Sequence, residues 1–288
     1  MKSLEPRQTQ SEQSLPALVR TRSLGLDFGN GLVLDGVDLD LNRGEIVGLI
    51  GPNGAGKTTL LSLLMGLLRP TAGAVWVSGQ PVASLTRRRL ARIMALVPQS
   101  LEIGFAFRVR EVVAMGRYPY LGRFRVPGEE DLTTIDEAMS LTGVDTLADR
   151  TIDTLSGGER QRVLIARAVA QQTPVVLLDE VTANLDLSHQ LDVLELASRM
   201  AADGRLVLAA IHDLALASRY CDRLLLLADG RLCADGSVRT VLTADHLQRF
   251  FGVEARIDDA PGGTGLIITP RLSTGRLRPA PVSRTVEI

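Results

Sequence analysis

The chain has 288 residues, of which 45% are hydrophobic, and its formal net charge is −1. This composition suits a globular chain with a sizeable core, built as one large domain or as a domain with a subdomain, and it lacks the basic excess expected when nucleic acid is the main partner. The two cysteines, Cys221 and Cys233, show no metal-ligand spacing, which excludes a disulfide scaffold and favours reduced thiols in a cytosolic protein.

The N-terminal stretch predicts no folded element. Residues 1–16 are rich in Gln, Ser, Glu and Pro and carry no periodicity, so we expect a disordered leader. This stretch has no apolar core like that of a signal peptide, and no apolar run in the sequence approaches the length that spans a bilayer. If the chain works at a membrane, another component must hold it there.

Short apolar runs recur from residue 18 onward, mostly separated by stretches with helical spacing. They predict buried strands of a largely parallel sheet at residues 46–50, 93–97, 175–178, 206–211 and 224–227. Residues 18–28 and 32–41 alternate more strictly around Asn30-Gly31, which predicts an antiparallel β piece beside that sheet.

A glycine-rich turn follows the run at 46–50 and reads GPNGAGKTT. Its glycines allow backbone N–H groups to curl around an anion, while Lys57 reaches the outer phosphates of a nucleotide and the Thr58 hydroxyl suits Mg²⁺. A chance glycine-rich turn is the alternative, but the complete motif between a strand and a helix favours nucleotide binding. The predicted nucleotide-binding residues of this loop are Gly51, Pro52, Asn53, Gly54, Ala55, Gly56, Lys57, Thr58 and Thr59.

Between residues 98 and 150 the strand signals fade and the spacing turns helical, which predicts a helical insertion. The later run at 175–178 ends in Asp179 and Glu180, and the carboxyl ends of strands in open α/β sheets are where ligands bind. Adjacent strand residues point to opposite sides, so we expect Asp179 near Mg²⁺ and Glu180 positioned to polarise an attacking water. Acidic residues after a strand also form turns and caps, but the phosphate loop favours the catalytic interpretation.

The segment Leu155-Ser-Gly-Gly-Glu159 precedes a helical stretch that extends to about residue 171. Ser156 and Glu159 have the spacing of a capping box. Gly157 and Gly158 leave backbone amides accessible at the positive end of the helix, which predicts a second anion site as an alternative to a merely well-capped helix. Two phosphate sites and one nucleotide suggest two subunits.

Five motifs follow one another along the chain: GPNGAGKTT, Gln99, LSGGE, VVLLDE and His212. With this ordered set the chain resembles the ATP-binding subunits of ABC transporters, over roughly residues 17–250. The resemblance implies an α/β P-loop NTPase of ABC type, with a mainly parallel sheet flanked by helices, an antiparallel β piece and a helical subdomain at about 98–165. Residues 251–288 form a C-terminal tail in this division, either as a little β structure or as a mobile segment.

The resemblance also implies ATP and Mg²⁺ as ligands, sandwiched in a head-to-tail homodimer, with residues 51–59 of one subunit facing Ser156, Gly157 and Gly158 of the other. It assigns Glu180 to general-base catalysis, Gln99 to Mg²⁺ and the attacking water, His212 to the γ-phosphate, and Asp186 to the segment that crosses the dimer interface. Taken alone, Gln99 is better explained as a solvated loop residue and His212 as a residue at the start of a helix.

The aromatic position that stacks on adenine in this family corresponds to Phe28, although a core role is the alternative. Val181 stands where the family usually has proline, which removes a constraint on the turn but no functional side chain.

Two segments, residues 109–119 and 182–190, resemble importers of ferric siderophores, haem and cobalamin, and the stretch at 250–259 favours an iron–siderophore cargo among these. The implied partners are an integral-membrane permease and, indirectly, a substrate-binding protein, with the chain on the cytoplasmic face of the inner membrane and no nucleic acid bound. A DNA-repair ATPase would need a long coiled coil before the LSGGE segment, where heptads are missing. A soluble assembly or regulatory ATPase stays open as an alternative.

Overall fold

The computed structural model describes residues 17–29, 31–99, 106–122, 125–183 and 185–271. The predicted leader at 1–16, Asn30 of the predicted turn and the tail beyond residue 271 lie outside these residues.

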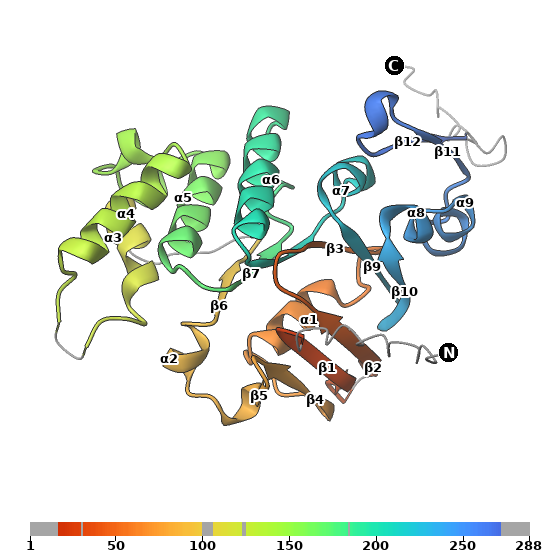
Figure 1. Ribbon diagram of the computed structural model, residues 1–288, viewed down its shortest axis with the longest axis horizontal. Helices are drawn as coiled ribbons and strands as arrows, with labels where there is room; N and C mark the ends of the chain where they lie inside the picture. Colours follow the sequence, from red (N-terminus) through yellow and green to blue (C-terminus); the bar gives the residue numbers. More distant parts are fainter. Residues whose placement is uncertain (1–16, 30, 100–105, 123–124, 184, 272–288) are drawn as a thin grey trace, which may run out of the picture.

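A six-stranded sheet forms the centre of the protein (Figure 1). Its strands lie in the order β10-β9-β3-β8-β7-β6. The five strands from β9 to β6 run parallel to one another, and β10 is antiparallel to β9. Their bounds are Ile46–Ile50 (β3), Met94–Val97 (β6), Val175–Asp179 (β7), Leu206–Ala210 (β8), Arg223–Ala228 (β9) and Arg231–Ser237 (β10). The prediction of a largely parallel sheet is therefore confirmed.

Alternation along the central strands divides the interior into two cores, one on each face of the sheet. In β3, Ile46 and Ile50 belong to one buried cluster, whereas Val47 and Leu49 belong to the other. Successive side chains of a strand point to opposite faces, so a strand covered on both sides must be apolar throughout. The unbroken run IVGLI meets that requirement, since all its residues are buried.

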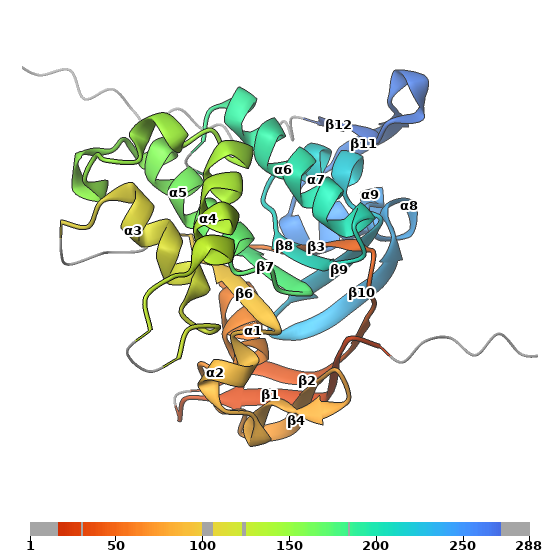
Figure 2. The same ribbon diagram turned by 60° about the vertical axis from the view of Figure 1, so that its left-hand side comes forward.

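A second sheet covers one of these faces (Figure 2). It is antiparallel, has the order β2-β1-β4-β5, and includes the β piece predicted from residues 18–41. Its strands are Val19–Asp27 (β1), Leu32–Leu41 (β2), Ala72–Val77 (β4) and Gln80–Pro81 (β5), followed by the short helices Val82–Ser84 (η1) and Arg87–Leu90 (α2). Helix α1 (Lys57–Leu64) lies between the two sheets and buries its leucines there.

Helices cover the opposite face of the central sheet. Helices α6 (Leu187–Ala202) and α7 (Leu214–Tyr220) lie over the sheet itself. A helical region extends beyond β6 and contains α3 (Val109–Ala114), η2 (Met115–Arg117), α4 (Glu129–Leu141), η3 (Asp145–Leu147), η4 (Ile152–Thr154) and α5 (Gly157–Ala170). These helices lie where the sequence predicts a helical insertion.

The remaining elements follow β10 and end in a small hairpin. They are α8 (Val238–Val241), α9 (Ala244–His246), η5 (Leu247–Phe251), β11 (Ala255–Asp259), η6 (Pro261–Gly263) and β12 (Leu266–Pro270). Strands β11 and β12 pair antiparallel, and the backbone N–H of Leu266 donates to Ser218 Oγ of α7 at 2.9 Å. Part of the predicted tail is thus β structure attached to α7. Among the described residues, no helix is long and apolar enough to cross a membrane.

Candidate functional site

The phosphate loop lies between β3 and α1, as the sequence predicts, and its backbone permits only glycine at critical places. Gly51 has a φ of 153°, and a Cβ atom there would lie 2.0 Å from the backbone oxygen of Leu227. Gly56, at a φ of 100°, immediately precedes α1 and packs against Leu34 and Val33 of β2. The loop therefore directs its amides and the positive end of α1 towards the same place.

An open cavity of about 590 Å³ lies beside this loop. Its lining brings together residues that follow three parallel strands: Gln99 after β6, Glu180 after β7 and His212 after β8. The phosphate loop and nearby segments supply the remaining lining residues, which are Val33, Asn53, Gly54, Ala55, Gly56, Lys57, Thr58, Thr59 and Ala183. Because parallel strands end at the same edge of a sheet, residues far apart in the sequence meet here.

Lys57 is the cation of this cavity. Its side chain is only 4% exposed, and Nζ donates to the backbone oxygens of Gly51 and Pro52 at 3.0 and 3.2 Å. Nζ also lies 3.7 Å from Glu180 Oε1. These contacts hold the ammonium group at the mouth of the loop, where an anionic phosphate would be its strongest partner.

Asp179 and Thr58 form an oxygen pair beside the lysine. The Thr58 hydroxyl donates to Asp179 Oδ1 at 3.1 Å. Burial raises the pKa of Asp179 above its ordinary value, while the hydrogen bond from Thr58 acts in the opposite direction. Hydroxyl and carboxylate oxygens fit Mg²⁺, which takes few protein ligands and keeps phosphate oxygens and water in its shell. The described residues contain no cluster of three or more His, Cys, Asp or Glu arranged for a metal.

Glu180 adopts an unusual backbone conformation immediately after β7. Its φ is 51°, in the left-handed region that non-glycine residues rarely adopt and that often marks functional sites. Its Oε1 lies 2.6 Å from His212 Nε2 as well as near Lys57. The prediction that Asp179 and Glu180 point to opposite sides assumed a continuing strand, but the chain turns at Glu180. Both carboxylates therefore contact the phosphate loop, through Thr58 and Lys57 respectively.

Phe28 lies in the loop between β1 and β2 and is 60% exposed. The alternative core role is therefore wrong. Asp27 Oδ1 accepts from the backbone N–H groups of Gly29 and Gly31 at 2.6 and 3.3 Å and fixes this loop. Val33, in the following strand, lines the cavity, whereas Phe28 is not among its described lining residues.

The LSGGE segment forms the predicted capping box at the start of α5. Ser156 Oγ accepts from the N–H of Glu159 at 3.3 Å, and Glu159 Oε2 accepts from the N–H of Ser156 at 2.8 Å. This backbone hydrogen bond from Ser156 is the main cause of the lowered pKa of Glu159. Ser156 and Gly157 are exposed and Gly158 is half-buried. The described lining of the 590 Å³ cavity does not include Ser156, Gly157 or Gly158.

Asp186 caps the N-terminus of α6. Its Oδ1 accepts from the backbone N–H of His189 at 3.0 Å, which lowers the pKa of Asp186. The side chain is 67% exposed. Like the LSGGE segment, it is accessible to a second molecule rather than directed into the cavity of its own chain.

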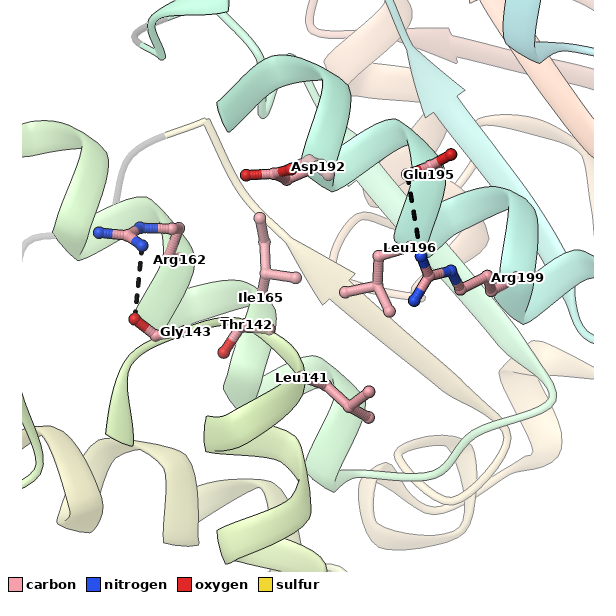
Figure 3. A pocket seen from close by; sticks show the side chains of 10 residues that line it. Leu141, Thr142, Gly143, Arg162, Ile165, Asp192, Glu195, Leu196 and Arg199 are labelled. Atoms are coloured by element: carbon pink, nitrogen blue, oxygen red, sulfur yellow. Dashed lines mark hydrogen bonds and ion pairs between the residues drawn. The ribbon is translucent and has the colours of Figure 1, made fainter. Parts of the chain in front are cut away.

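A smaller cavity of about 200 Å³ separates the helical region from α6 (Figure 3). Figure 3 shows Arg162 and Ile165 of α5 on one side and Asp192 and Leu196 of α6 on the other. Arg162 Nη1 donates to the backbone oxygen of Gly143 at 3.4 Å. The described residues that line this cavity include none from the phosphate loop. It is therefore separate from the nucleotide site.

Two glutamines that sequence reasoning did not identify as site residues hold the loops of the site. Gln161 of α5 is 6% exposed and donates through Nε2 to the backbone oxygen of Pro98 at 3.3 Å, next to Gln99. Gln190 Nε2 donates to the backbone oxygens of Thr182 and Leu185 at 3.0 and 2.9 Å and closes the turn between Glu180 and α6. Such bonds to carbonyl oxygens leave no sequence signal.

A P-loop at the carboxyl edge of a parallel sheet, with two carboxylates and a histidine beside it, defines a nucleoside-triphosphate-binding α/β protein. Residues 34–183 match the family model described as ABC transporter. The chain belongs to the ABC transporter family, as the ordered motifs predict.

Related proteins of known role are similar over most of the chain. The cobalamin import ATP-binding protein of Halobacterium salinarum is 46% identical over 86% of this chain and 62% of that protein, so the chain spans less than two thirds of this relative. The hemin import ATP-binding protein of Nocardia farcinica is 47% identical, over 83% of this chain and 82% of that protein. The ferric enterobactin transport ATP-binding protein of Escherichia coli is 39% identical, over 88% and 94%.

Solved structures show the same fold. One chain of a transporter described as metal-chelate type, in an inward-facing conformation, has a TM-score of 0.77 at 30% identity and covers 89% of this chain and 98% of that chain. A dimeric ATP-binding cassette in a post-hydrolysis state, bound to ADP and Pi, has a TM-score of 0.68 at 28% identity and covers 77% and 99%.

Proposed function

We propose that the protein is the MgATP-hydrolysing subunit of an importer for metal chelates. The observation that carries the proposal is the convergence of Lys57, Asp179, Glu180 and His212 on one phosphate loop. In phosphoryl transfer the protein supplies positioning and charge stabilisation, and these groups are placed for both tasks.

Each side chain then has a distinct role. Lys57 and the loop amides hold the outer phosphates, and Thr58 and Asp179 hold Mg²⁺, with Gln99 close to the ion and the attacking water. Bound Mg²⁺ neutralises the charge of the β- and γ-phosphates. Glu180 accepts the proton of the attacking water, and His212, 2.6 Å from that carboxylate, orients it and contacts the γ-phosphate.

A second subunit completes each site in this proposal. Ser156, Gly157 and Gly158 bind the nucleotide of the partner in a head-to-tail homodimer, Asp186 lies at the interface, and Phe28 stacks on adenine. Ser156, Gly157 and Asp186 are exposed, and the described lining of the cavity does not include them, which supports this arrangement. The dimeric state of the ADP-bound relative supports it as well.

Complementation between two inactive variants tests the shared site. Lys57→Ala removes the phosphate cation. Gly157→Glu places a carboxylate at the predicted anion site of α5, where an added Cβ meets no atom within 4 Å, so the fold is preserved. In a head-to-tail dimer of one Lys57→Ala and one Gly157→Glu subunit, one of the two sites is intact.

Each variant alone should hydrolyse almost no ATP, and an equimolar mixture should recover roughly a quarter of wild-type activity if subunits exchange at random and sites act independently. Full activity of Gly157→Glu alone, or no recovery in the mixture, would contradict a shared site.

The relatives named for cobalamin, hemin and ferric enterobactin support a metal chelate as cargo. They do not single out ferric siderophores, so that narrower prediction needs transport measurements. The proposed partners are an integral-membrane permease and a substrate-binding protein, with the chain on the cytoplasmic face of the cell membrane. Membrane fractionation separates this function from that of a soluble assembly or regulatory ATPase, which would stay in the soluble fraction.

A further inference from the structure

Positive charge is concentrated in one part of a chain whose net charge is only −1. No acidic residue occurs between Glu45 and Glu102. That segment contains five exposed arginines, which we call the arginine patch: Arg69, Arg87, Arg88, Arg89 and Arg92.

The members of the patch are close in space. Three of them belong to α2, which lies at the outer edge of the molecule near β4 (Figure 2). Arg88 and Arg92 both donate through Nε to the backbone oxygen of Pro119, at 2.9 and 2.8 Å, which places their guanidinium groups side by side. Arg69 and Arg87 line the same cavity.

No carboxylate in the described part of the chain neutralises these cations. Arg88 and Arg92 bond to carbonyl oxygens, and Arg69, Arg87 and Arg89 make no side-chain hydrogen bond or ion pair with the described residues. By contrast, the exposed arginines Arg231, Arg239 and Arg256 each pair with an aspartate. The patch therefore carries charge that is free to attract an anionic partner.

An apolar cavity of about 550 Å³ adjoins the patch, with Arg69 and Arg87 among its lining residues. Its apolar lining residues include Leu63, Leu68, Val75, Val82, Leu85 and Leu90. Leu67, next to this lining, is 52% exposed. A cationic surface beside an apolar hollow is suited to a ligand with an anionic head and an apolar body.

We propose that the arginine patch and this cavity bind anionic phospholipid at the membrane surface. Guanidinium groups bind phosphate through paired N–H donors, and clusters of basic residues are attracted to anionic headgroups. The apolar lining favours a lipid over a nucleic acid, which has no apolar chain. A phospholipid offers a phosphate and an acyl chain together, so it fits adjoining cations and an apolar cavity better than a highly charged acidic segment does. This inference rests on the proposed function in one respect, because a subunit that works at a membrane has a lipid surface beside it as a ligand.

The test is co-flotation of the purified full-length protein with vesicles, without permease. We expect binding to vesicles of phosphatidylcholine with phosphatidylglycerol, little binding to phosphatidylcholine alone, and weaker binding at high salt. The variant R69Q/R87Q/R89Q removes guanidinium groups that make no hydrogen bond or ion pair with the described residues. It should lower the vesicle affinity on the order of a hundredfold. R231Q/R239Q/R256Q changes the net charge equally and should bind like the wild type.

Failure of the wild type to float with anionic vesicles would overturn the proposal, as would equal losses in the two triple variants. Stronger competition by an RNA oligonucleotide or a polyglutamate peptide than by anionic vesicles would replace the lipid with that partner. ATP hydrolysis by R69Q/R87Q/R89Q in solution should equal that of the wild type. A failed flotation with intact hydrolysis would therefore refute the lipid site alone, whereas absent hydrolysis with intact flotation would refute the proposed function alone.

Discussion

Glu180→Gln is the substitution that isolates the proposed general base. Glutamine preserves the shape of the side chain and its capacity to hydrogen-bond to His212, now 2.6 Å from Oε1. It removes the negative charge 3.7 Å from Lys57 Nζ, but the lysine keeps its two backbone acceptors in the phosphate loop. The architecture of the cavity should therefore survive, while the ability to accept a proton is lost.

The expected kinetic effect follows from the role assigned to this carboxylate. A positioned general base contributes about 10²- to 10⁴-fold to a rate, so the variant should raise the activation barrier by roughly 3–5 kcal/mol. Affinity for MgATP should not fall, because removing a carboxylate from the cavity reduces repulsion of an anionic ligand. Steady-state phosphate release measures turnover, and calorimetric titration measures binding.

The matched control is Glu195→Gln, which neutralises a carboxylate that is 64% exposed on α6 and remote from the phosphate loop. Its turnover and affinity should equal those of the wild type. Turnover of Glu180→Gln within about threefold of wild type, a barrier change below about 1 kcal/mol, would refute the general-base assignment.

Three further predictions address phosphate binding by Lys57, the helical region and the thiols. Lys57→Ala should weaken MgATP binding by at least about tenfold, because it removes a charge-assisted partner of the phosphates. An unchanged Kd in calorimetry would refute phosphate binding by Lys57. The hydrogen bond from Arg117, 2.8 Å from the Asp131 carboxylate, lowers the pKa of Asp131, so its contribution to stability is present above the unfolded pKa and is lost as pH falls through the folded pKa. Asp131→Asn should therefore cost about 2 kcal/mol at neutral pH and little at strongly acidic pH in denaturant titrations; a cost independent of pH would contradict the ion pair. Burial raises the pKa of Cys221 to about 12, whereas Cys233 is exposed, so a thiol reagent at mildly alkaline pH should modify only Cys233 until the protein is denatured; mass spectrometry that finds Cys221 modified in the native protein would contradict its burial.

The sequence predicted those parts of the fold that depend on local pattern. The run at 46–50 coincides with β3 because a strand buried on both faces must be apolar at every position. The capping box of Ser156 and Glu159 was predictable because its bonds join residues three apart. Strand β10 was not predicted, because its burial alternates between half-buried and exposed and RLCADGS contains few residues that favour strands.

In the candidate site, likewise, the motifs predicted which residues meet but not the backbone geometry that places them. The motifs predicted that Gln99, Glu180 and His212 share a site, and all three line the cavity. The sequence could not show that the backbone turns at Glu180 with a φ of 51°, since that conformation is imposed by tertiary contacts. The buried amide of Gln161 was equally hidden, because its partner is a backbone oxygen far away in the sequence.

The proposed function requires that this ATPase energises a permease. The most direct test is to express tagged Glu180→Gln in its native cells, trap it with MgATP, solubilise the membranes gently and identify what co-purifies. We expect a polytopic permease of the siderophore, haem or cobalamin class in stoichiometric amount. Recovery of soluble partners alone would contradict the transport function and leave only the ATPase chemistry.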